Sequence, residues 1–234
     1  LVDEEQKELV FWTIHHGGGE VLREQRMPVG QGIAGWVATH GRPLIVNDVQ
    51  GDARFARSFS QKITDATGFH IRAILCVPLW AREKVIGVVE VLNKVSGADF
   101  DAEDQNTLMA LASYAAIAIE NARLYEAVYN GYVDTMKALA ATIDAKDPYT
   151  RGHSERVTTY AQRTAQQMNL APDEMAALKY GAILHDIGKI GIDEHILRKP
   201  RPLNVREKVV MDSHPAIGAN IIEGIRFLKE AQPV

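Results

Sequence analysis

Hydrophobic and polar positions alternate over the first hundred residues in a way that predicts a β-sheet covered by helices. Short runs of β-branched and aromatic side chains are separated by turns rich in glycine, which is typical of strands. We expect strands at residues 9–15, 21–29, 43–49, 71–79 and 84–92. Ile33, Trp36 and Val37 have helical spacing, and residues 50–70 have the polar character of a loop with a short helix. The pattern predicts an α+β domain with an antiparallel sheet and flanking helices.

A long uninterrupted helix is predicted next, over residues 102–145. Asp101 can cap its N-terminus, and Glu103 and Asp104 place negative charge at the positive end of the helix dipole. From there to about residue 145 the chain has no proline and a single glycine, Gly131. This helix links the α+β domain to the part of the chain that follows.

Apolar or small side chains recur three and four residues apart along the linking helix, which is the spacing of a coiled-coil seam. One interpretation is that the stripe packs on the chain's own two domains. The other is that it pairs with the same stripe of a second chain. A stripe of roughly 50 Å exceeds what one small domain covers, so we favour a parallel homodimer through the linking helix. The positions are Leu108, Leu111, Ala115, Ala118, Ala122, Tyr125, Tyr129, Tyr132, Met136, Leu139 and Ile143.

The chain after Asp147 and Pro148 has a helical pattern throughout. Helices are expected at residues 153–168, 172–186, 204–213 and 215–228. Pro200 and Pro202 mark the loop between the middle pair. The second part of the chain is therefore predicted to be an all-α domain.

Composition and charge exclude several classes of protein. With 234 residues, 46% hydrophobic and 24% charged, the chain is neither disordered, nor collagen, nor a disulfide scaffold. The formal net charge is −4 and neither half has the basic surplus expected of a nucleic-acid binder, so no nucleic-acid polymer is expected as a partner. No stretch approaches the roughly 20 apolar residues of a membrane span. The single cysteine, Cys76, lies in an apolar run and indicates a reducing compartment, the cytoplasm.

Histidine and aspartate residues at the ends of the predicted helices are the candidate chemistry. His185 and Asp186 are adjacent at the end of an apolar helix, and His153 and His214 stand at helix starts on either side. Adjacent helical side chains project about 100° apart, so a shared metal requires a distorted helix end or an ion off the helix axis. Three imidazoles and one carboxylate suit iron, manganese, zinc or nickel.

The helical part closely resembles the HD-GYP family over about residues 134 to 230. The resemblance lies in residues 147–154, residues 184–192, Ile196-Leu197, Lys199-Pro200, Leu203, Glu207, His214-Pro215 and Gly218. The HD superfamily consists of metal-dependent phosphohydrolases, and its HD-GYP branch hydrolyses the cyclic dinucleotide cyclic diguanylate to a linear dinucleotide or GMP. The resemblance therefore implies a metal-dependent phosphodiesterase with a cyclic dinucleotide as substrate.

Carried over position by position, the resemblance makes His153, His185, Asp186 and His214 metal ligands, with Asp186 bridging two divalent transition metals. Iron or manganese is favoured, and zinc or nickel is an alternative. Lys189 would neutralise charge on the scissile phosphate, and its alternative role is that of a solvated cation at a helix end. These roles agree with the chemistry, because hydrolysis needs water of lowered pKa and positive charge near the developing phosphorane.

The sequence departs from the family pattern at three points. The Gly-Tyr-Pro loop, its paired histidines and a further aspartate lie beyond residue 234, so the domain 134–234 is expected to be the N-terminal part only. Arg201 stands where the family usually has glycine, which alters the loop and adds a possible phosphate contact. Tyr149 stands where members with a third metal carry glutamate, which indicates two metals. We expect this chain to bind metal weakly and to show little turnover.

Residues 1–125 resemble a GAF domain, a sensor fold for small molecules. The resemblance lies in residues 30–37, 43–49, 76–79 and 85–94, together with Phe100, Asp101 and Asp104. It implies a small-molecule ligand whose identity is unknown, and the position of Cys76 in a core strand disfavours bilin attachment. The domain is expected to lack its first helix and part of its first strand.

The sequence leaves three functions to compare for this chain. The favoured one is a cytoplasmic bacterial signalling protein in which the GAF domain regulates an HD-GYP phosphodiesterase. The second is a regulator that binds a ligand and dimerises without catalysis, and the third is an HD phosphohydrolase acting on another nucleotide.

Overall fold

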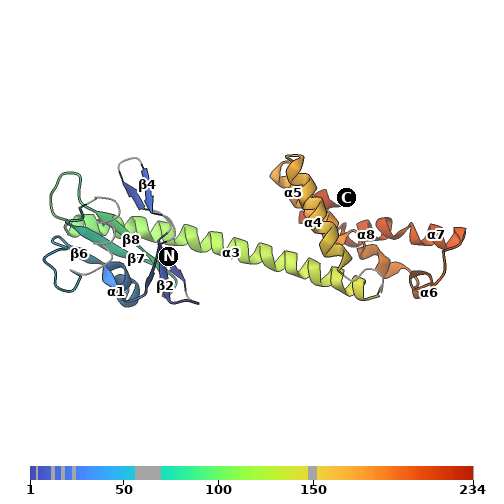
Figure 1. The fold of residues 1–234 in the computed structure, drawn as a ribbon, viewed down its shortest axis with the longest axis horizontal. Helices are drawn as coiled ribbons and strands as arrows, with labels where there is room; N and C mark the ends of the chain where they lie inside the picture. Colours follow the sequence, from blue (N-terminus) through green and yellow to red (C-terminus); the bar gives the residue numbers. More distant parts are fainter. Residues whose placement is uncertain are drawn as a thin grey trace. The chain divides into compact units, whose positions relative to one another are not determined.

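The computed structural model describes residues 1–3, 5–11, 14–16, 19–22, 25–55, 70–146 and 152–233. These residues form two compact units, Leu1–Leu124 and Tyr125–Val234, and one continuous helix, α3 (Ala102–Lys146), belongs to both (Figure 1). The fold has the expected composition, an α+β unit with antiparallel sheets, a long helix and a helical unit.

The first unit contains three antiparallel sheets among its described residues. One has the order β1 (Val2–Asp3), β2 (Glu8–Phe11) and β5 (Gln25–Pro28), and in the second β3 (Ile14–His16) pairs with β4 (Gly19–Leu22). The third has the order β6 (Leu44–Val46), β7 (Ile74–Ala81) and β8 (Lys84–Leu92). Strand β8 is as predicted. The strand predicted at 9–15 overlaps β2 and β3, and that at 21–29 overlaps β4 and β5, while residues 12–13 and 23–24 lie outside the described residues. Part of the predicted loop and helix at 50–70 lies outside the described residues.

Strand β7 shows how alternation in the sequence creates two cores. Ile74 and Cys76 face a cluster under helix α1 (Gly32–His40), whereas Leu75, Val77 and Leu79 pack against Leu108, Ala112 and Ala116 of α3. Successive strand residues point to opposite faces, so a strand buried on both faces is apolar throughout. The thiol of Cys76 is fully buried, as expected from its apolar surroundings, and burial raises its pKa.

Helix α1 confirms the helical spacing of Ile33, Trp36 and Val37, since Ile33 and Val37 are buried and Trp36 packs on the same cluster. The turn before it depends on glycine. Gly30 has φ 92°, and a Cβ on Gly35 would lie 2.8 Å from the backbone nitrogen of Gly30. Neither position accepts a side chain without movement of the backbone.

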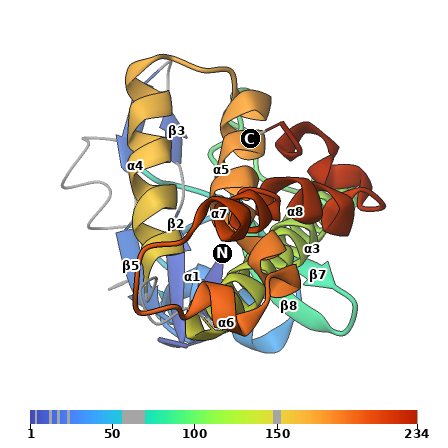
Figure 2. The same cartoon turned by 90° about the vertical axis from the view of Figure 1, so that its right-hand side faces the viewer.

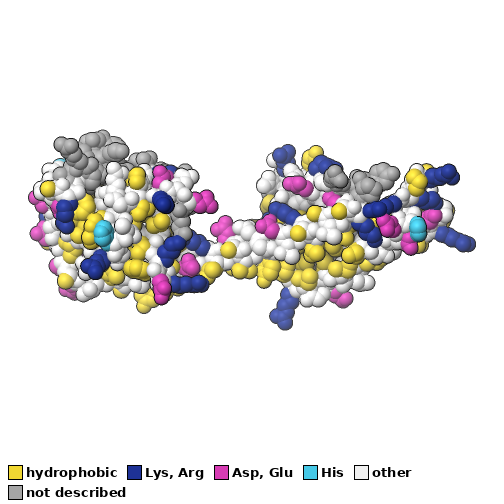
Figure 3. Space-filling model, turned by 90° about the horizontal axis from the view of Figure 1, so that it is seen from below, with side chains coloured by type: hydrophobic (Ala, Val, Ile, Leu, Met, Phe, Trp, Pro, Cys, Tyr) yellow, Lys and Arg dark blue, Asp and Glu magenta, His cyan; other side chains and the backbone are white. Residues whose placement is uncertain are grey.

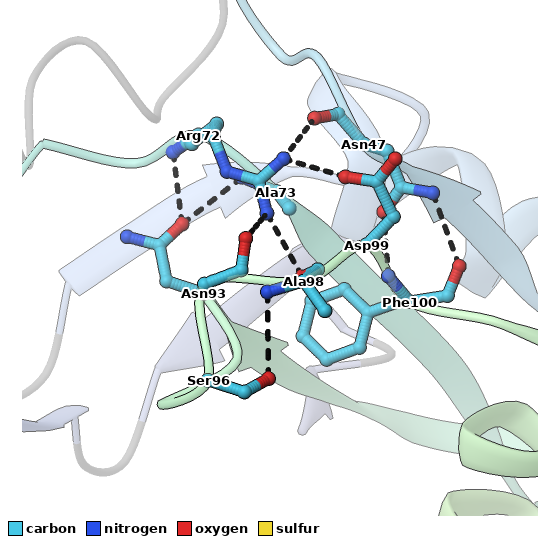
Figure 4. A network of polar contacts seen from close by, with 9 residues as sticks. Asn47, Arg72, Ala73, Asn93, Ser96, Ala98, Asp99 and Phe100 are labelled. Atoms are coloured by element: carbon cyan, nitrogen blue, oxygen red, sulfur yellow. Dashed lines mark hydrogen bonds and ion pairs between the residues drawn. The ribbon is translucent and has the colours of Figure 1, made fainter.

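A network of polar contacts fixes the segment between β8 and α3 (Figure 4). The Arg72 guanidinium donates to Asp99 Oδ1 and to the carbonyl oxygens of Asn47, Gly97 and Ala98. The Asn93 side-chain oxygen accepts from the backbone nitrogens of Arg72 and Ala73. These two nitrogens are therefore engaged by a side chain, which explains why β7 starts at Ile74 rather than at the predicted residue 71.

Asn47 binds the same segment further along. Its Nδ2 donates to the carbonyl oxygen of Phe100, and its Oδ1 accepts from the nitrogen of Phe100. The predicted strand 43–49 is accordingly shortened to β6, because Asn47 leaves the sheet to make these contacts. Asp101 Oδ1 then accepts from the nitrogens of Glu103 and Asp104, as predicted for the N-cap of α3.

The predicted seam on α3 is divided between two environments. Leu108, Met136 and Ile143 are buried within their own units. Leu111, Tyr125, Tyr132 and Leu139 are exposed, together with other apolar side chains on α3, namely Tyr114, Ile117, Leu124 and Val128. Three of the eleven predicted positions are thus part of the chain's own cores, and the exposed apolar side chains form a stripe.

The second unit is helical, as predicted. Helices α4 (His153–Gln167) and α5 (Pro172–Leu184) lie side by side, as Figure 2 shows. After α5 come the 3₁₀ helix η1 (Ile187–Gly191), α6 (Glu194–Leu197), α7 (Val205–Met211), α8 (His214–Ile222) and the 3₁₀ helix η2 (Arg226–Ala231). The helix predicted at 215–228 is therefore wrong beyond Ile222, where a turn separates α8 from η2. None of the helices in the described parts has the length and hydropathy that crossing a bilayer requires.

Candidate metal centre

The candidate site is built on the turn that ends helix α5. The prediction that this helix runs to Asp186 is wrong, because α5 ends at Leu184 and His185 is its C-cap. Asp186 is the N-cap of η1, with φ −99° and ψ 3°, outside the helical range of α5. The distorted helix end that a shared metal requires is present, because the chain leaves the α-helical path between the two residues.

Backbone contacts orient two of the imidazole rings. His185 Nδ1 lies 2.9 Å from the carbonyl oxygen of Ala182, and His214 Nδ1 lies 2.8 Å from that of Met211. A carbonyl oxygen only accepts, so each Nδ1 carries the proton and donates. In the neutral form of either ring Nε2 then keeps its lone pair, which is the arrangement that metal-binding histidines use.

Three side chains converge at the turn. His185 Nε2 lies 3.2 Å from His153 Nε2 and 3.4 Å from Asp186 Oδ2. His153, His185 and Asp186 each offer a ligand atom, and these atoms lie within 4.8 Å of one another. Two nitrogens that each lie about 2.1 Å from one cation are separated by about 3 Å. The observed spacing fits a shared divalent cation.

His214 approaches the other oxygen of the same carboxylate. Its Nε2 lies 3.6 Å from Asp186 Oδ1, whereas His185 Nε2 lies near Oδ2. Asp186 therefore has one imidazole near each of its oxygens.

Lys189 also reaches this carboxylate. Its Nζ lies 2.9 Å from Asp186 Oδ2, and the Lys189 side chain is 13% exposed. A solvated cation at a helix end does not describe this lysine, because its ammonium points into the cluster. Asp186 is only 6% exposed, and a buried carboxylate needs a partner of opposite charge.

Close packing of η1 against α8 brings His214 to the site. A Cβ on Gly188 would overlap the carbonyl oxygen of His214 and lie 2.5 Å from the nitrogen of Gly218. The two segments approach closely because Gly188 has no side chain. Gly188 and Gly218 both belong to the motif residues, and the structure shows that a glycine at 188 is what permits this close approach.

Other residues of the resemblance have different contacts in the second unit or lie outside the described part. Arg201 is exposed in the loop before α7, and Lys199 Nζ donates to Glu207, which caps α7 with Asn204. Residues 147–151, including Tyr149, fall outside the described residues, so the structure gives no position for them. Sequence reasoning missed the contact of Ser154 Oγ, which donates to Asp144 Oδ1 at 3.1 Å.

Fold and cluster together define a class of protein, in which an α+β domain is followed through one helix by a helical domain with a histidine–aspartate cluster. Residues 1–120 match the family model of the GAF domain, and residues 150–232 match that of the HD domain. The chain belongs to the GAF domain family and carries an HD domain after the GAF domain.

Two similar curated proteins are named as phosphodiesterases. The chain is 32% identical over 148 residues to 3′3′-cGAMP-specific phosphodiesterase 3 of Vibrio cholerae, covering 62% of this chain and 30% of that protein. It is 34% identical over 112 residues to the dual 3′,5′-cyclic-AMP and -GMP phosphodiesterase 11A of Takifugu rubripes, covering 47% of this chain and 12% of that protein. The chain spans less than a third of either relative.

A solved structure is also similar. The free methionine-R-sulfoxide reductase of Neisseria meningitidis, in complex with its substrate, is 26% identical and covers 53% of this chain and 66% of its own, with a TM-score of 0.40. At this TM-score the likeness says nothing about a shared ligand.

Proposed function

We propose that this protein is a metal-dependent phosphodiesterase of the HD-GYP type that hydrolyses a cyclic dinucleotide and is regulated by its GAF domain. The observation that carries the proposal is the cluster of His153, His185 and the buried Asp186, whose ligand atoms lie within 4.8 Å of one another, with His214 Nε2 3.6 Å from Asp186 Oδ1. The matched HD domain and the phosphodiesterase relative of V. cholerae support it.

The donor set of the cluster fits divalent transition metals. Imidazole nitrogens with a carboxylate suit iron, manganese, zinc and nickel, and iron or manganese is our first choice. His153, His185, Asp186 and His214 would hold the ions, with Asp186 shared between two of them. A bound divalent cation supplies water of lowered pKa and positive charge for the transition state.

The chain's own residues contribute binding and orientation. The Nδ1–H groups of His185 and His214, donated to backbone carbonyls, keep each Nε2 directed at the site. Lys189 holds positive charge beside Asp186, where it would stabilise the negative charge that develops on a phosphodiester.

Cyclic diguanylate is the substrate that we favour, and 3′3′-cGAMP is the second candidate because the V. cholerae relative is named for it. Both are cyclic dinucleotides with phosphodiester bonds, so the same site chemistry serves either one. Side-by-side hydrolysis rates on the two dinucleotides and on a panel of other nucleotides distinguish them, and a preference outside the cyclic dinucleotides would indicate a different HD phosphohydrolase.

The test of the site combines metal content with hydrolysis. Elemental analysis of residues 1–234 and of the protein at its full natural length is expected to show manganese or iron, with about two ions per chain in the latter. Chromatography of the cyclic dinucleotide before and after incubation is expected to show its loss with the full-length protein. His185→Ala is expected to remove both metal and activity, and His195→Ala, a histidine of α6, is the matched control.

Absence of both metal and hydrolysis in the full-length protein would contradict the proposal. The protein would then be a regulator that binds a ligand and dimerises, with the HD fold as a scaffold. Metal without hydrolysis of any cyclic dinucleotide would retain the metal centre and reject the substrate.

We further propose that α3 joins two copies of the chain. Hydrophobic side chains gather along part of α3 and over the helical unit in Figure 3, and Leu111, Tyr125, Tyr132 and Leu139 are exposed at seven-residue or fourteen-residue intervals. Such an interval keeps side chains on one face of a helix in a left-handed coiled coil. A homodimer through this stripe would place the two GAF domains on helices that lead directly to the HD domains.

A further inference from the structure

Lys146, the last residue of α3, makes contacts that no sequence motif indicates. Its Nζ lies 2.9 Å from the carbonyl oxygen of Ile192, 3.1 Å from that of Ile190 and 3.4 Å from that of Lys189. An ammonium group has three N–H donors and no acceptor. All three donors of Lys146 therefore have acceptors, and all of these acceptors belong to one short segment.

That segment is the C-terminal end of η1 (Ile187–Gly191) and its cap. The last carbonyl groups of a helix have no partner within the helix and form its negative end. The cation of Lys146 satisfies these carbonyls and neutralises the negative end. The opposite end of η1 begins directly after Asp186, and η1 itself carries Lys189.

The backbone of Lys146 also makes a hydrogen bond outside α3. The Arg198 Nε donates to the carbonyl oxygen of Lys146 at 3.0 Å. The end of α3 is thus joined to η1 through the Lys146 side chain and to the residue after α6 through its backbone. Both contacts lie within the second unit. The side-chain contacts of Lys146 connect the linking helix directly to η1, which follows Asp186 of the candidate site.

We infer that Lys146 is a positioning residue, which holds η1 and thereby sets where Lys189 and Asp186 stand in the metal centre. It contacts neither of these side chains through its ammonium, so it acts through the backbone of η1. Because α3 is one continuous helix from Ala102, a shift at its C-terminal end moves the group that holds η1. The consequence for metal binding rests on the proposed function, whereas the positioning itself does not.

The test compares Lys146→Met with Lys137→Met. Lys137 is on the same helix, its side chain is 62% exposed and it is paired with Asp134 at 3.7 Å, so the control removes the same charge without touching η1. Hydrogen exchange is followed by mass spectrometry in peptides covering residues 184–192 of the metal-free chain. Exchange there is expected to be at least about tenfold faster in Lys146→Met and unchanged in Lys137→Met.

The second readout is the affinity for Mn²⁺, measured by electron paramagnetic resonance of the free ion. Loss of a group that orients metal ligands typically costs 10- to 100-fold in affinity, so we expect the Kd of Lys146→Met to rise about tenfold. Lys146→Arg keeps a cation at the same carbonyls with a different donor geometry, and is expected to restore part of both readouts. If Lys146→Met does not fold by circular dichroism, Lys146→Arg is expected to show intermediate values.

The outcomes separate the two proposals. Unchanged exchange and unchanged Mn²⁺ affinity in a folded Lys146→Met variant would overturn the positioning role and leave the metal centre intact. If the unsubstituted chain binds no Mn²⁺, the proposed metal centre fails, and the exchange measurement alone decides whether Lys146 positions η1. Faster exchange over the whole second unit, rather than at residues 184–192, would also overturn the inference, since it indicates general destabilisation.

Discussion

The backbone of Gly188 lies directly against the carbonyl oxygen of His214, with no room for a side chain between them. This contact joins η1, which follows Asp186, to the first turn of α8, which carries His214. Asp186 and His214, two ligands proposed for the metal centre, are thus brought together by Gly188, which has no side chain.

Gly188→Ala is therefore expected to destabilise the second unit and to displace His214. A methyl group forced against backbone atoms costs about 1–3 kcal/mol or more, because the segments have to separate. Thermal unfolding followed by circular dichroism is expected to show a lower Tm for the helical unit. Gly224→Ala is the control, because a Cβ there meets nothing within 4 Å, and an equal loss in both variants would contradict the role of close packing.

Glu90 predicts how the stability of the GAF domain depends on pH. Burial raises the pKa of its carboxyl to about 7, against 4.5 as the ordinary value, while the hydrogen bond from Cys76 lowers it in part. The folded state then binds the proton more tightly than the unfolded state. The contribution of the protonated Glu90 to the free energy of unfolding is complete below about pH 4.5. It is lost as the pH rises to about 7, a change in this free energy of at most about 3 kcal/mol.

Glu90→Gln is expected to be more stable than the unsubstituted protein at pH 8 and to differ little from it at pH 4.5, because the amide never ionises. Urea unfolding is followed by fluorescence of Trp12, Trp36 and Trp80, which all lie in the first unit. Glu83→Gln, in the exposed turn between β7 and β8, is the matched control. Identical pH profiles for Glu90→Gln and the unsubstituted protein would show that this carboxyl does not determine how the free energy of unfolding depends on pH.

Asn47 provides a third prediction, at the start of the linking helix. Its side chain makes two hydrogen bonds with the backbone of Phe100, a residue buried against α3. Asn47→Ala removes both, at about 1 kcal/mol each, so a loss of about 2 kcal/mol is expected in urea unfolding of the first unit. Ser96→Ala, at the exposed edge of the same network (Figure 4), removes only a contact of 3.4 Å and is expected to change stability by less than about 0.5 kcal/mol.

Local patterns predicted those parts of the fold that depend on local interactions. The limits of β8 and the N-cap of α3 at Asp101 agree with the structure because alternation and capping chemistry are complete within a few residues. The end of α5 was not predictable in the same way. The helical pattern extends to Asp186, whereas α5 ends at Leu184 and the next segment packs closely on α8 through Gly188, a tertiary contact that the local sequence does not reveal.

The residues of the candidate site could be named from the sequence, but their supporting contacts could not. Histidine and aspartate at helix ends suggested a metal centre, and the resemblance to the HD-GYP family selected His153, His185, Asp186 and His214. Lys146 gave no signal, because its partner carbonyls lie more than 40 residues further along the chain and any residue has a carbonyl group. The apolar seam on α3 was also ambiguous. Side chains spaced three and four residues apart are expected both on a helix face buried within its own unit and on an exposed face.

The exposed side chains of the seam on α3 supply the last prediction. If the stripe of Leu111, Tyr125, Tyr132 and Leu139 joins two chains, Tyr125→Glu places like charges opposite each other in the seam. We expect this variant to be monomeric in sedimentation equilibrium at concentrations where the unsubstituted chain is dimeric. Asn130→Glu is the matched control, since residue 130 is exposed on α3 and lies about 140° around the helix from residue 125. Dimers in both variants would place the interface elsewhere, and monomers throughout would reject the dimer. Because Tyr125 lies outside the buried clusters described for either unit, its substitution is expected to leave the unfolding of both units unchanged, so a change in mass would report association alone.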